Sequence, residues 1–226
     1  MNNNIFDNCD SKTNGEESFF NVISDKINVI FDVGCRNDSI FLNFRGIVHY
    51  FDPVNNFMES LKQKSNNNKT SYFNNFGLGN KNGELYYYPR YQSFINRIIS
   101  CNIDDEQNKI LLKIKTAKDY LEENSLTTET IDFLKIDTEG YELNVLQGFE
   151  KYVENVKIIQ FEYGGTYLDS NIKLIDVIEY LRNKNFNEFY YLTQTHLIPI
   201  QDFTDHYKYC NIICVNNNYR NEFLPR

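Results

Sequence analysis

Short apolar runs recur along the chain, and polar stretches separate them. Four of these runs, residues 27–33, 47–51, 131–136 and 157–161, are rich in β-branched and aromatic residues. Nearly continuous apolar runs of this length are typical of strands that are covered on both faces of a parallel sheet. Residues 172–181 carry isoleucine or leucine at every third position, a spacing typical of an amphipathic helix. Strands that alternate with helices predict an α/β fold.

Shorter signals predict the remaining elements. Residues 116–123 are expected to form a helix, because Thr116 is a good N-cap and Asp119 stands where it can complete a capping box. Residues 71–88 are expected to form two strands joined by a turn at Asn82-Gly83. Further helices are predicted over residues 16–26, 54–64 and 141–149, and further strands over residues 110–115, 189–192 and 209–215.

The first strong strand ends in a sequence that is typical of a nucleotide pocket. Asp32 and Gly34 close the strand, and a glycine there lets the backbone approach a cofactor. Asp38 or Ser39 is expected to cap a following helix, whose amides would face the same cleft. The alternative is an ordinary turn between a strand and a helix.

A second carboxylate ends the next strand. Asp52 follows Asp32 by twenty residues, where α/β folds hold ribose hydroxyls, because a carboxylate accepts two hydrogen bonds from a diol. The alternative role of Asp52 is to cap the helix at residues 54–64, and the two roles are compatible. His49, on the same strand, is expected to be a structural histidine.

The segment LKIDTEGYE at residues 134–142 carries the strongest chemical signal. Asp137 and Glu139 come directly after an apolar strand, and Glu162 ends the next strand, so these carboxylates should meet at one edge of the sheet. There they can take a proton or bind a metal ion. Glu142 has the alternative role of stabilising the N-terminus of the following helix. His196, in the loop at residues 193–206, is a further catalytic candidate.

Residues 89–105 lack a clear period and are expected to form a loop. Ser93, Asn96 and Arg97 are polar residues among aromatic ones, so this loop is a candidate lid that selects the substrate. A plain surface crossover is equally consistent with the sequence.

Charge and cysteine content narrow the function. The 226 residues carry a formal net charge of −8, which makes a broad grip on phosphate backbones unfavourable, so we expect no nucleic-acid partner. Five cysteines without a CxxC pair favour reduced, mostly buried thiols, and the polar first fifteen residues without an apolar h-region favour a cytoplasmic location. No run of eighteen apolar residues is present, so membrane insertion is not expected. We expect a polar extension with a lead-in helix at residues 1–26 and a single domain at residues 27–226.

The order of four sequence blocks resembles the FkbM family of S-adenosylmethionine-dependent methyltransferases. The blocks are VIFDVG, YFDP, LKIDTEGYELNVLQGFE and IIQFEY, and the resemblance runs from about residue 27 to about residue 215. It implies a Rossmann-like class I methyltransferase fold, with helices on both faces of a seven-stranded, mostly parallel sheet whose last strand is antiparallel. It also implies methyl transfer to a hydroxyl group, often on a sugar or glycan.

The resemblance implies roles for particular residues. The adenosylmethionine site would be built from Asp32, Gly34, Asp52 and the loop at Phe76 and Gly77. Asp137 corresponds to the acid of the family's IDxEG motif, close to the site of methyl transfer, with Glu139 beside it. Asp137 would act as a base or, with Glu162, as a ligand of Mg²⁺ or Mn²⁺.

The chain departs from the family pattern at one position. Family members have a second glycine four residues after the first, and this chain has Asp38 there. The Asp38 carboxylate would attract the ammonium group of the cofactor and repel its carboxylate, for which Arg36 is the candidate partner. The alternative function is therefore a non-catalytic, methyltransferase-like binding or scaffold module. An NAD-linked oxidoreductase is disfavoured because GxGxxG is missing.

Overall fold

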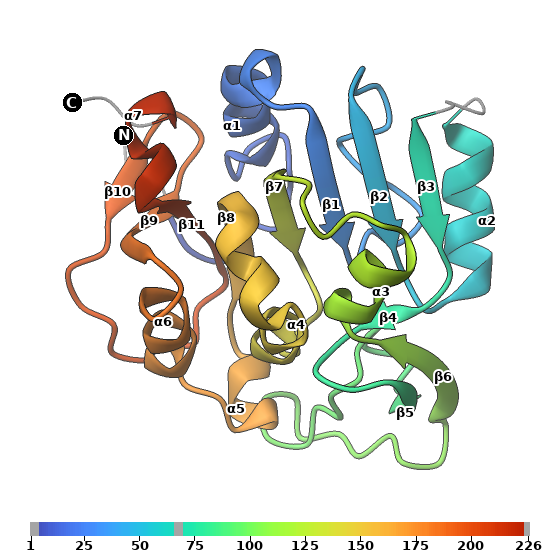
Figure 1. Ribbon diagram of the computed structural model, residues 1–226. Helices are drawn as coiled ribbons and strands as arrows, with labels where there is room; N and C mark the ends of the chain where they lie inside the picture. The colour runs from blue at the N-terminus through green and yellow to red at the C-terminus, as the bar shows by residue number, and fades with distance from the viewer. Residues whose placement is uncertain (1–4, 66–69, 224–226) are drawn as a thin grey trace.

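The computed structural model describes residues 5–65 and 70–223, and it has the expected α/β architecture (Figure 1). The helices are α1 (Glu16–Ile23), α2 (Asn55–Lys64), α3 (Ala117–Glu123), α4 (Glu142–Gly148), α5 (Thr166–Ser170), α6 (Leu174–Arg182) and α7 (Arg220–Phe223). The strands are β1 (Val29–Val33), β2 (Ile47–Phe51), β3 (Ser71–Asn74), β4 (Gly77–Leu78), β5 (Gly83–Tyr87), β6 (Ile110–Lys115), β7 (Ile131–Ile136), β8 (Val156–Tyr163), β9 (Phe186–Leu192), β10 (Leu197–Pro199) and β11 (Cys210–Asn216). Three short 3₁₀ helices cover Ser24–Lys26, Glu150–Asn155 and Asn217–Tyr219.

The main sheet has eight strands in the order β10-β9-β11-β8-β7-β1-β2-β3. Neighbours from β8 through β3 are parallel, whereas β11 is antiparallel to both β8 and β9. The predicted seven strands with an antiparallel last strand are therefore present. The eighth, β10, is a short edge strand that pairs with β9 inside the expected loop at residues 193–206.

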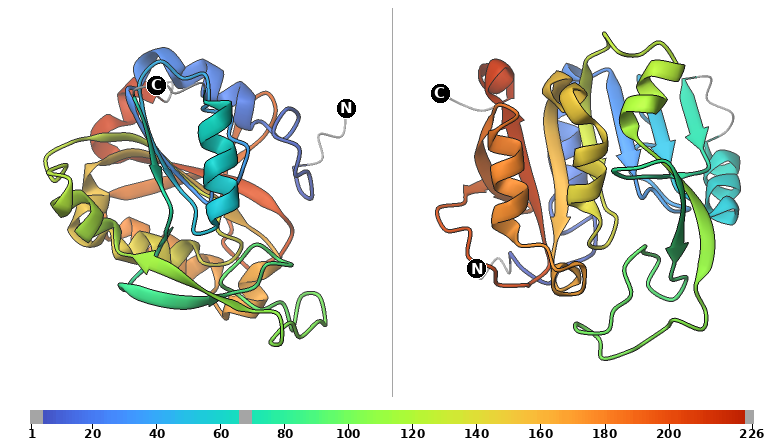
Figure 2. Two further views of the ribbon diagram at one scale, coloured as in Figure 1. Left: turned by 90° about the vertical axis from the view of Figure 1, so that its right-hand side faces the viewer. Right: turned by 60° about the horizontal axis from the view of Figure 1, so that its bottom comes forward.

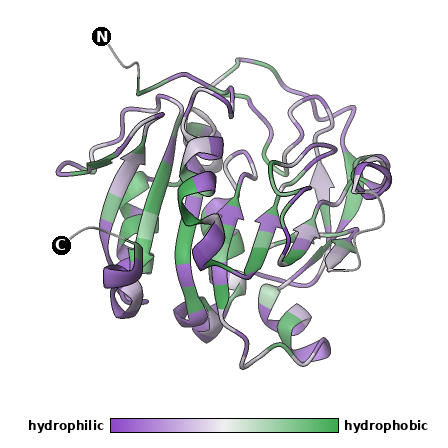
Figure 3. Cartoon of the chain, turned by 90° about the horizontal axis from the view of Figure 1, so that it is seen from above, coloured by the Kyte–Doolittle hydropathy of each residue, from purple (hydrophilic) through white to green (hydrophobic). Residues whose placement is uncertain are grey.

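An apolar layer covers each face of this sheet. Side chains of α3, α4 and α6 pack on one face, and those of α1 and α2 pack on the other. The left view of Figure 2 shows these two groups of helices on opposite sides of the strands. The central strands are the most hydrophobic part of the chain, and the helices show mixed hydropathy (Figure 3). Because side chains alternate along a strand, Asp32 and Lys135 point to the α1 side, with their neighbours Ile30 and Phe133.

Residues 71–88 differ from the prediction. The strands β4 and β5 do not pair with each other, because β6 lies between them in a separate three-stranded sheet. Asn82 accepts a hydrogen bond from the backbone N–H of Thr116 at 2.9 Å, so the turn holds the start of α3 instead of closing a hairpin. The Thr116 hydroxyl accepts from the N–H of Asp119, which confirms the predicted N-cap.

The helix predicted after β1 does not form. Residues 35–46 make turns instead, and no described residue among them is helical. Ser39 donates to the Asp32 carboxylate at 2.6 Å and accepts from the N–H of Phe41, so its hydroxyl is bound to the strand end and a local turn. Phe41 and Phe44 are buried against Phe20 of α1, with ring centroids 5.0 and 5.7 Å apart. This packing anchors the segment without a helix.

Two further predictions concern the whole chain. Among the described residues, no helix combines the length and the apolar character that a membrane span requires. All five cysteines are free thiols, and three of them, Cys35, Cys210 and Cys214, are buried.

Candidate active site

The carboxyl ends of β1, β7 and β8 open into a cavity of about 590 Å³, which we call the acidic cavity. Its walls also include the irregular segment after β1 and part of the N-terminal segment before α1. The lining side chains that matter below are Lys12, Glu16, Asp32, Arg36, Asp38, Lys135, Asp137, Glu139 and Glu162.

A close contact between β1 and β7 fixes the geometry of this edge. Gly34 has a φ of +81°, and a Cβ atom there would lie 1.9 Å from the carbonyl oxygen of Asp137. The backbone N–H of Asp137 donates to Val33 at 2.9 Å. Glycine is therefore required by both conformation and space, and it places the end of β1 against the predicted catalytic acid.

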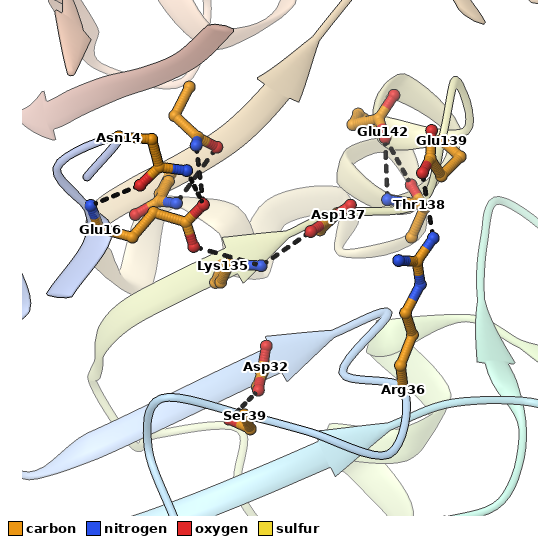
Figure 4. Close-up of polar contacts among 12 residues, drawn as sticks. Asn14, Glu16, Asp32, Arg36, Ser39, Lys135, Asp137, Thr138, Glu139 and Glu142 are labelled. Atoms are coloured by element: carbon orange, nitrogen blue, oxygen red, sulfur yellow. Dashed lines mark hydrogen bonds and ion pairs between the residues drawn. The ribbon is translucent and has the colours of Figure 1, made fainter. Parts of the chain in front are cut away.

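Lys135 is the central cation of the cavity (Figure 4). Its ammonium lies 3.0 Å from the Asp137 carboxylate and 3.8 Å from the Glu16 carboxylate, and the side chains of Lys135 and Glu16 are only 11% and 8% exposed. Asn14 and Asn211 each donate to Glu16 at 2.8 Å. The N-terminal segment thus supplies a buried counter-ion to a lysine of the central strand.

Asp137 and Glu162 form a carboxyl pair in which the two pKa values shift in opposite directions. Burial alone would raise the pKa of Asp137, but the Lys135 ammonium and a hydrogen bond with Glu162 outweigh it and hold that pKa below its usual value. Burial, followed by the charges of Asp137 and Glu139, raises the pKa of Glu162 well above its usual range. One oxygen of Glu162 is buried without a hydrogen-bond partner among the described residues. These opposite shifts favour an ionised Asp137 beside a Glu162 that retains its proton.

Glu139 is held by two arginines. Arg36 pairs with it at 3.1 Å, and Arg97 of the loop at residues 89–105 pairs with its other oxygen. Burial and the Asp137 charge raise the pKa of Glu139, and the two guanidinium groups oppose that rise. Glu139 therefore connects the loop after β1 to the predicted lid.

Asp32 and Asp52, the two acids predicted to bind the cofactor, are buried. Asp32 is 2% exposed, and burial raises its pKa to about 6. Asp52 is 3% exposed and accepts from the N–H groups of Arg36 and Val54, at 3.0 and 2.8 Å. Burial raises its pKa to about 6 as well. Asp52 thus fixes the turn before α2, but the N-cap of that helix is Val54 and has no side-chain cap hydrogen bond, so the predicted capping role is wrong.

Beside Asp52 the structure leaves little space. The hollow between Asp52, Gly77 and Asp137 is about 30 Å³, because the ring of Phe94 packs directly on Gly77. Phe76, by contrast, turns into the core against Phe51, with ring centroids 5.9 Å apart. Phe94 of the loop at residues 89–105 therefore lies against Gly77 at this edge of the sheet, and the role of the loop as a lid stays a prediction.

Ser93 and Asn96 of that loop make hydrogen bonds within the protein. Ser93 is buried and donates to the carbonyl oxygen of Glu139 at 2.9 Å. Asn96 donates to Asp104 at 2.9 Å and accepts from the N–H of Asp105. A substrate role for Ser93, Asn96 and Arg97 stays a prediction.

Two polar candidates lie away from the acidic cavity. Glu142 is 1% exposed and accepts from the N–H groups of Thr138 and Gly140, so it holds the turn before α4. His196 is exposed in the turn between β9 and β10, bonded to Thr195 at 2.9 Å, and it does not line this cavity. The structure brings Asp137, Glu139 and Glu162 together but not His196.

The Asp38 side chain points to solvent and does not fill the turn after β1. Its side chain is 82% exposed and lies 4.0 Å from the ammonium of Lys64. His49, as predicted, is structural, because it is buried, bonded to Tyr120 at 2.7 Å and stacked on Tyr72.

Sequence reasoning missed Lys135, Glu16 and Lys12. Lys135 carried a usable signal, since a lone charge inside a buried strand, two residues before an acid, requires a partner. Glu16 and Lys12 carried none, because only the folded chain brings the N-terminal segment to the cavity.

Comparisons with known proteins support the family that the sequence resembles. The family model described as the methyltransferase FkbM domain matches residues 32–188, more than half of the chain. Two solved structures share the fold with a TM-score of 0.50. A TehB-like SAM-dependent methyltransferase from Corynebacterium glutamicum is 9% identical over 90% of this chain and 88% of that chain. The METTL16 MTase domain is 10% identical over 88% of this chain and 65% of that chain.

A methyltransferase FkbM from Methylobacillus flagellatus KT is 15% identical with a TM-score of 0.49. The match covers 83% of this chain but 43% of that protein, so this chain spans less than half of its length. Among curated proteins, none matches the sequence at a significant level. The matched domain and the fold together place the chain in the FkbM methyltransferase family, with the fold of class I S-adenosylmethionine-dependent methyltransferases.

Proposed function

We propose that the protein methylates a hydroxyl group of a sugar or glycan. S-adenosylmethionine, when bound, supplies an electrophilic methyl group. A sugar hydroxyl is a poor nucleophile near neutral pH, so the protein must take its proton as the new bond forms. A positioned base contributes roughly a hundred- to ten-thousandfold to such a step.

The carboxyl pair of Asp137 and Glu162 carries this proposal. Asp137 is ionised and held by Lys135 at 3.0 Å, and a second carboxyl group lies beside it with a buried, unpartnered oxygen. A hydroxyl proton transferred to Asp137 leaves both carboxyl groups of the pair neutral, and the Lys135 ammonium then keeps Glu16 as its counter-ion. The pair is therefore a proton acceptor that is built into the edge where the family resemblance expects methyl transfer.

The side chains fit the cofactor, with one movement required. The sulfonium and ammonium groups suit the acidic cavity, where one oxygen of Asp32 is buried without a partner among the described residues. Ligand sites for drug-sized molecules have about 300–1,000 Å³, and the cavity has about 590 Å³. Asp52 stands where it would hold the ribose, but the Phe94 ring must leave Gly77 to make room.

The charge of the cavity supports an uncharged acceptor. Carboxylates outnumber cations along its walls, with Glu16, Glu17, Asp32, Asp38, Asp137, Glu139 and Glu162 against Lys12, Arg36 and Lys135. A phosphate-bearing acceptor would be repelled by this excess of negative charge. A neutral sugar hydroxyl is compatible with it.

The donor set does not favour a metal ion. Asp137, Glu139 and Glu162 each offer one oxygen, and these atoms lie within 4.8 Å of one another. Two of the three already pair with protein cations, Asp137 with Lys135 and Glu139 with the two arginines. A divalent ion would have to displace these partners, so we derive no step through Mg²⁺ or Mn²⁺.

Methyl transfer to a panel of neutral sugars and oligosaccharides tests the proposal. Full-length wild type is incubated with methyl-labelled S-adenosylmethionine, beside Asp137→Asn and the control Asp25→Asn, which changes an exposed acid outside the acidic cavity. We expect turnover for the wild type and the control, and a loss of at least about a hundredfold for Asp137→Asn with cofactor affinity retained. Unchanged turnover of Asp137→Asn would remove the proposed base.

A non-catalytic binding module is the second candidate function. The nearly closed hollow beside Asp52 and the missing helix after β1 favour it. Calorimetric titration separates the two functions, because a methyltransferase must bind the cofactor. Absence of binding at millimolar S-adenosylmethionine would leave only the binding module.

A further inference from the structure

The N-terminal segment before α1 is fixed across one side of the acidic cavity. The N–H of Asp7 donates to the carbonyl oxygen of Tyr209 at 2.9 Å, and the N–H of Tyr209 donates back to the Asp7 carboxylate at 3.1 Å. At the other end, Glu16 is bound by Asn211 and by Asn14. The residues between these anchors cannot move away from the cavity without breaking them.

A tight turn between the anchors presents Lys12. The Asp10 carboxylate accepts from the N–H of Lys12 at 3.2 Å, and the Asp10 carbonyl oxygen accepts from the N–H groups of Thr13 and Asn14. Lys12 is exposed and lines the cavity. The turn therefore holds a lysine at the cavity wall through backbone contacts, and its ammonium is not used to build the turn.

The other cations of the cavity are already engaged. Arg36 pairs with Glu139, and Lys135 pairs with Asp137 and Glu16. In the part of the chain that the structure describes, Lys12 makes no ion pair, which sets it apart from the two other cations on these walls. It is the cation that a ligand carboxylate can reach without breaking a contact.

The cavity needs such a cation for one part of the cofactor. S-adenosylmethionine carries a carboxylate on its methionine moiety, and the surrounding walls are mainly acidic. A helix after the first strand would offer its N-terminal amides to an anion, but residues 35–46 form no helix here. The exposed Asp38 carboxylate in this segment would repel the anion further.

We propose that Lys12 binds the methionine carboxylate of the cofactor, so that the N-terminal segment completes the cofactor site. This inference rests on the proposed function, because it requires adenosylmethionine in the acidic cavity. It assigns to the polar extension a role that the helix after β1 would otherwise fill. It also transfers the predicted carboxylate partner from Arg36 to Lys12.

Two ligands, one with and one without the amino acid moiety that carries the carboxylate, test the inference. S-adenosylhomocysteine carries the amino acid moiety, whereas 5′-methylthioadenosine lacks it and keeps the adenosine. Both are titrated by calorimetry into full-length wild type and Lys12→Met. Loss of a charge-assisted contact should weaken S-adenosylhomocysteine about tenfold, while 5′-methylthioadenosine changes less than about twofold. The second ligand also reports whether the variant is folded.

Two further variants sharpen the result. Lys12→Arg keeps the charge and should retain S-adenosylhomocysteine affinity within about threefold. Lys81→Met, which removes an exposed lysine outside the acidic cavity, should leave both affinities unchanged. Equal losses for both ligands in Lys12→Met, or wild-type affinity for S-adenosylhomocysteine, would overturn the inference. Wild type that binds neither ligand would overturn the proposed function, and this inference with it.

Discussion

Replacement of Lys135 by methionine is expected to destabilise the fold, because it leaves buried carboxylates without their cation. The Lys135 side chain is 11% exposed, and its ammonium lies between Asp137 and Glu16. Removing one partner of a buried ion pair costs about 3–5 kcal/mol. Asp137 keeps 32% of its side chain exposed, so we expect the lower end, about 3 kcal/mol.

The loss of stability in Lys135→Met should depend on pH. The Lys135 ammonium lowers the pKa of both Asp32 and Asp137, so both pKa values rise in the variant. A carboxyl group whose pKa is higher in the folded than in the unfolded state favours folding as it becomes protonated. The deficit of the variant should therefore shrink as the pH falls from about 7 to about 4.

Urea denaturation of wild type and Lys135→Met at several pH values measures this effect. The control is Lys184→Met, because Lys184 also pairs with a carboxylate, Glu154 at 3.2 Å, but on the surface. Such pairs contribute about 0–1 kcal/mol. Equal losses for the two variants, or a deficit that grows as the pH falls, would refute the account of the buried cluster.

Three more substitutions, the first with Gly83→Ala as its control, test separate parts of the structure. Gly34→Ala should lower the free energy of unfolding by at least about 2 kcal/mol in thermal denaturation, since φ is +81° and the new Cβ would meet the Asp137 carbonyl oxygen. Gly83→Ala, with φ +132° but nothing within 4 Å, should cost less, and an equal cost would contradict the steric argument. Phe94→Ala should speed S-adenosylhomocysteine association severalfold in stopped-flow tyrosine fluorescence, because it opens the hollow beside Asp52; an unchanged rate would show that the ring is not the barrier. His196→Ala should leave methyl transfer unchanged, because His196 is exposed outside the acidic cavity, whereas a large loss would restore it as a catalytic residue.

Local sequence signals predicted the central strands well. The bounds of β2 and β7 agree with the predicted runs, because residues rich in β-branched and aromatic side chains favour strands, and the bounds of β6 in the smaller sheet agree as well. The meeting of Asp137 and Glu162 at one edge also followed, since the two residues lie at the ends of adjacent parallel strands.

Features that depend on distant contacts were not predictable. Capping signals at Asp38 and Ser39 favoured a helix, but the burial of Phe41 and Phe44 against α1 fixed the segment as turns. Local propensity gave way to tertiary packing there. The pairing of Lys135 with Glu16 joins residues 119 positions apart in the sequence, and no local pattern reports it.

The structure of the protein with S-adenosylhomocysteine, solved by crystallography, tests the account most directly. We expect the sulfur atom to face the Asp137–Glu162 pair, the ribose hydroxyls to reach Asp52, and the Phe94 ring to have left Gly77. A sulfur atom directed away from the carboxyl pair, or a ligand bound away from the carboxyl ends of β1 and β7, would contradict the proposed active site.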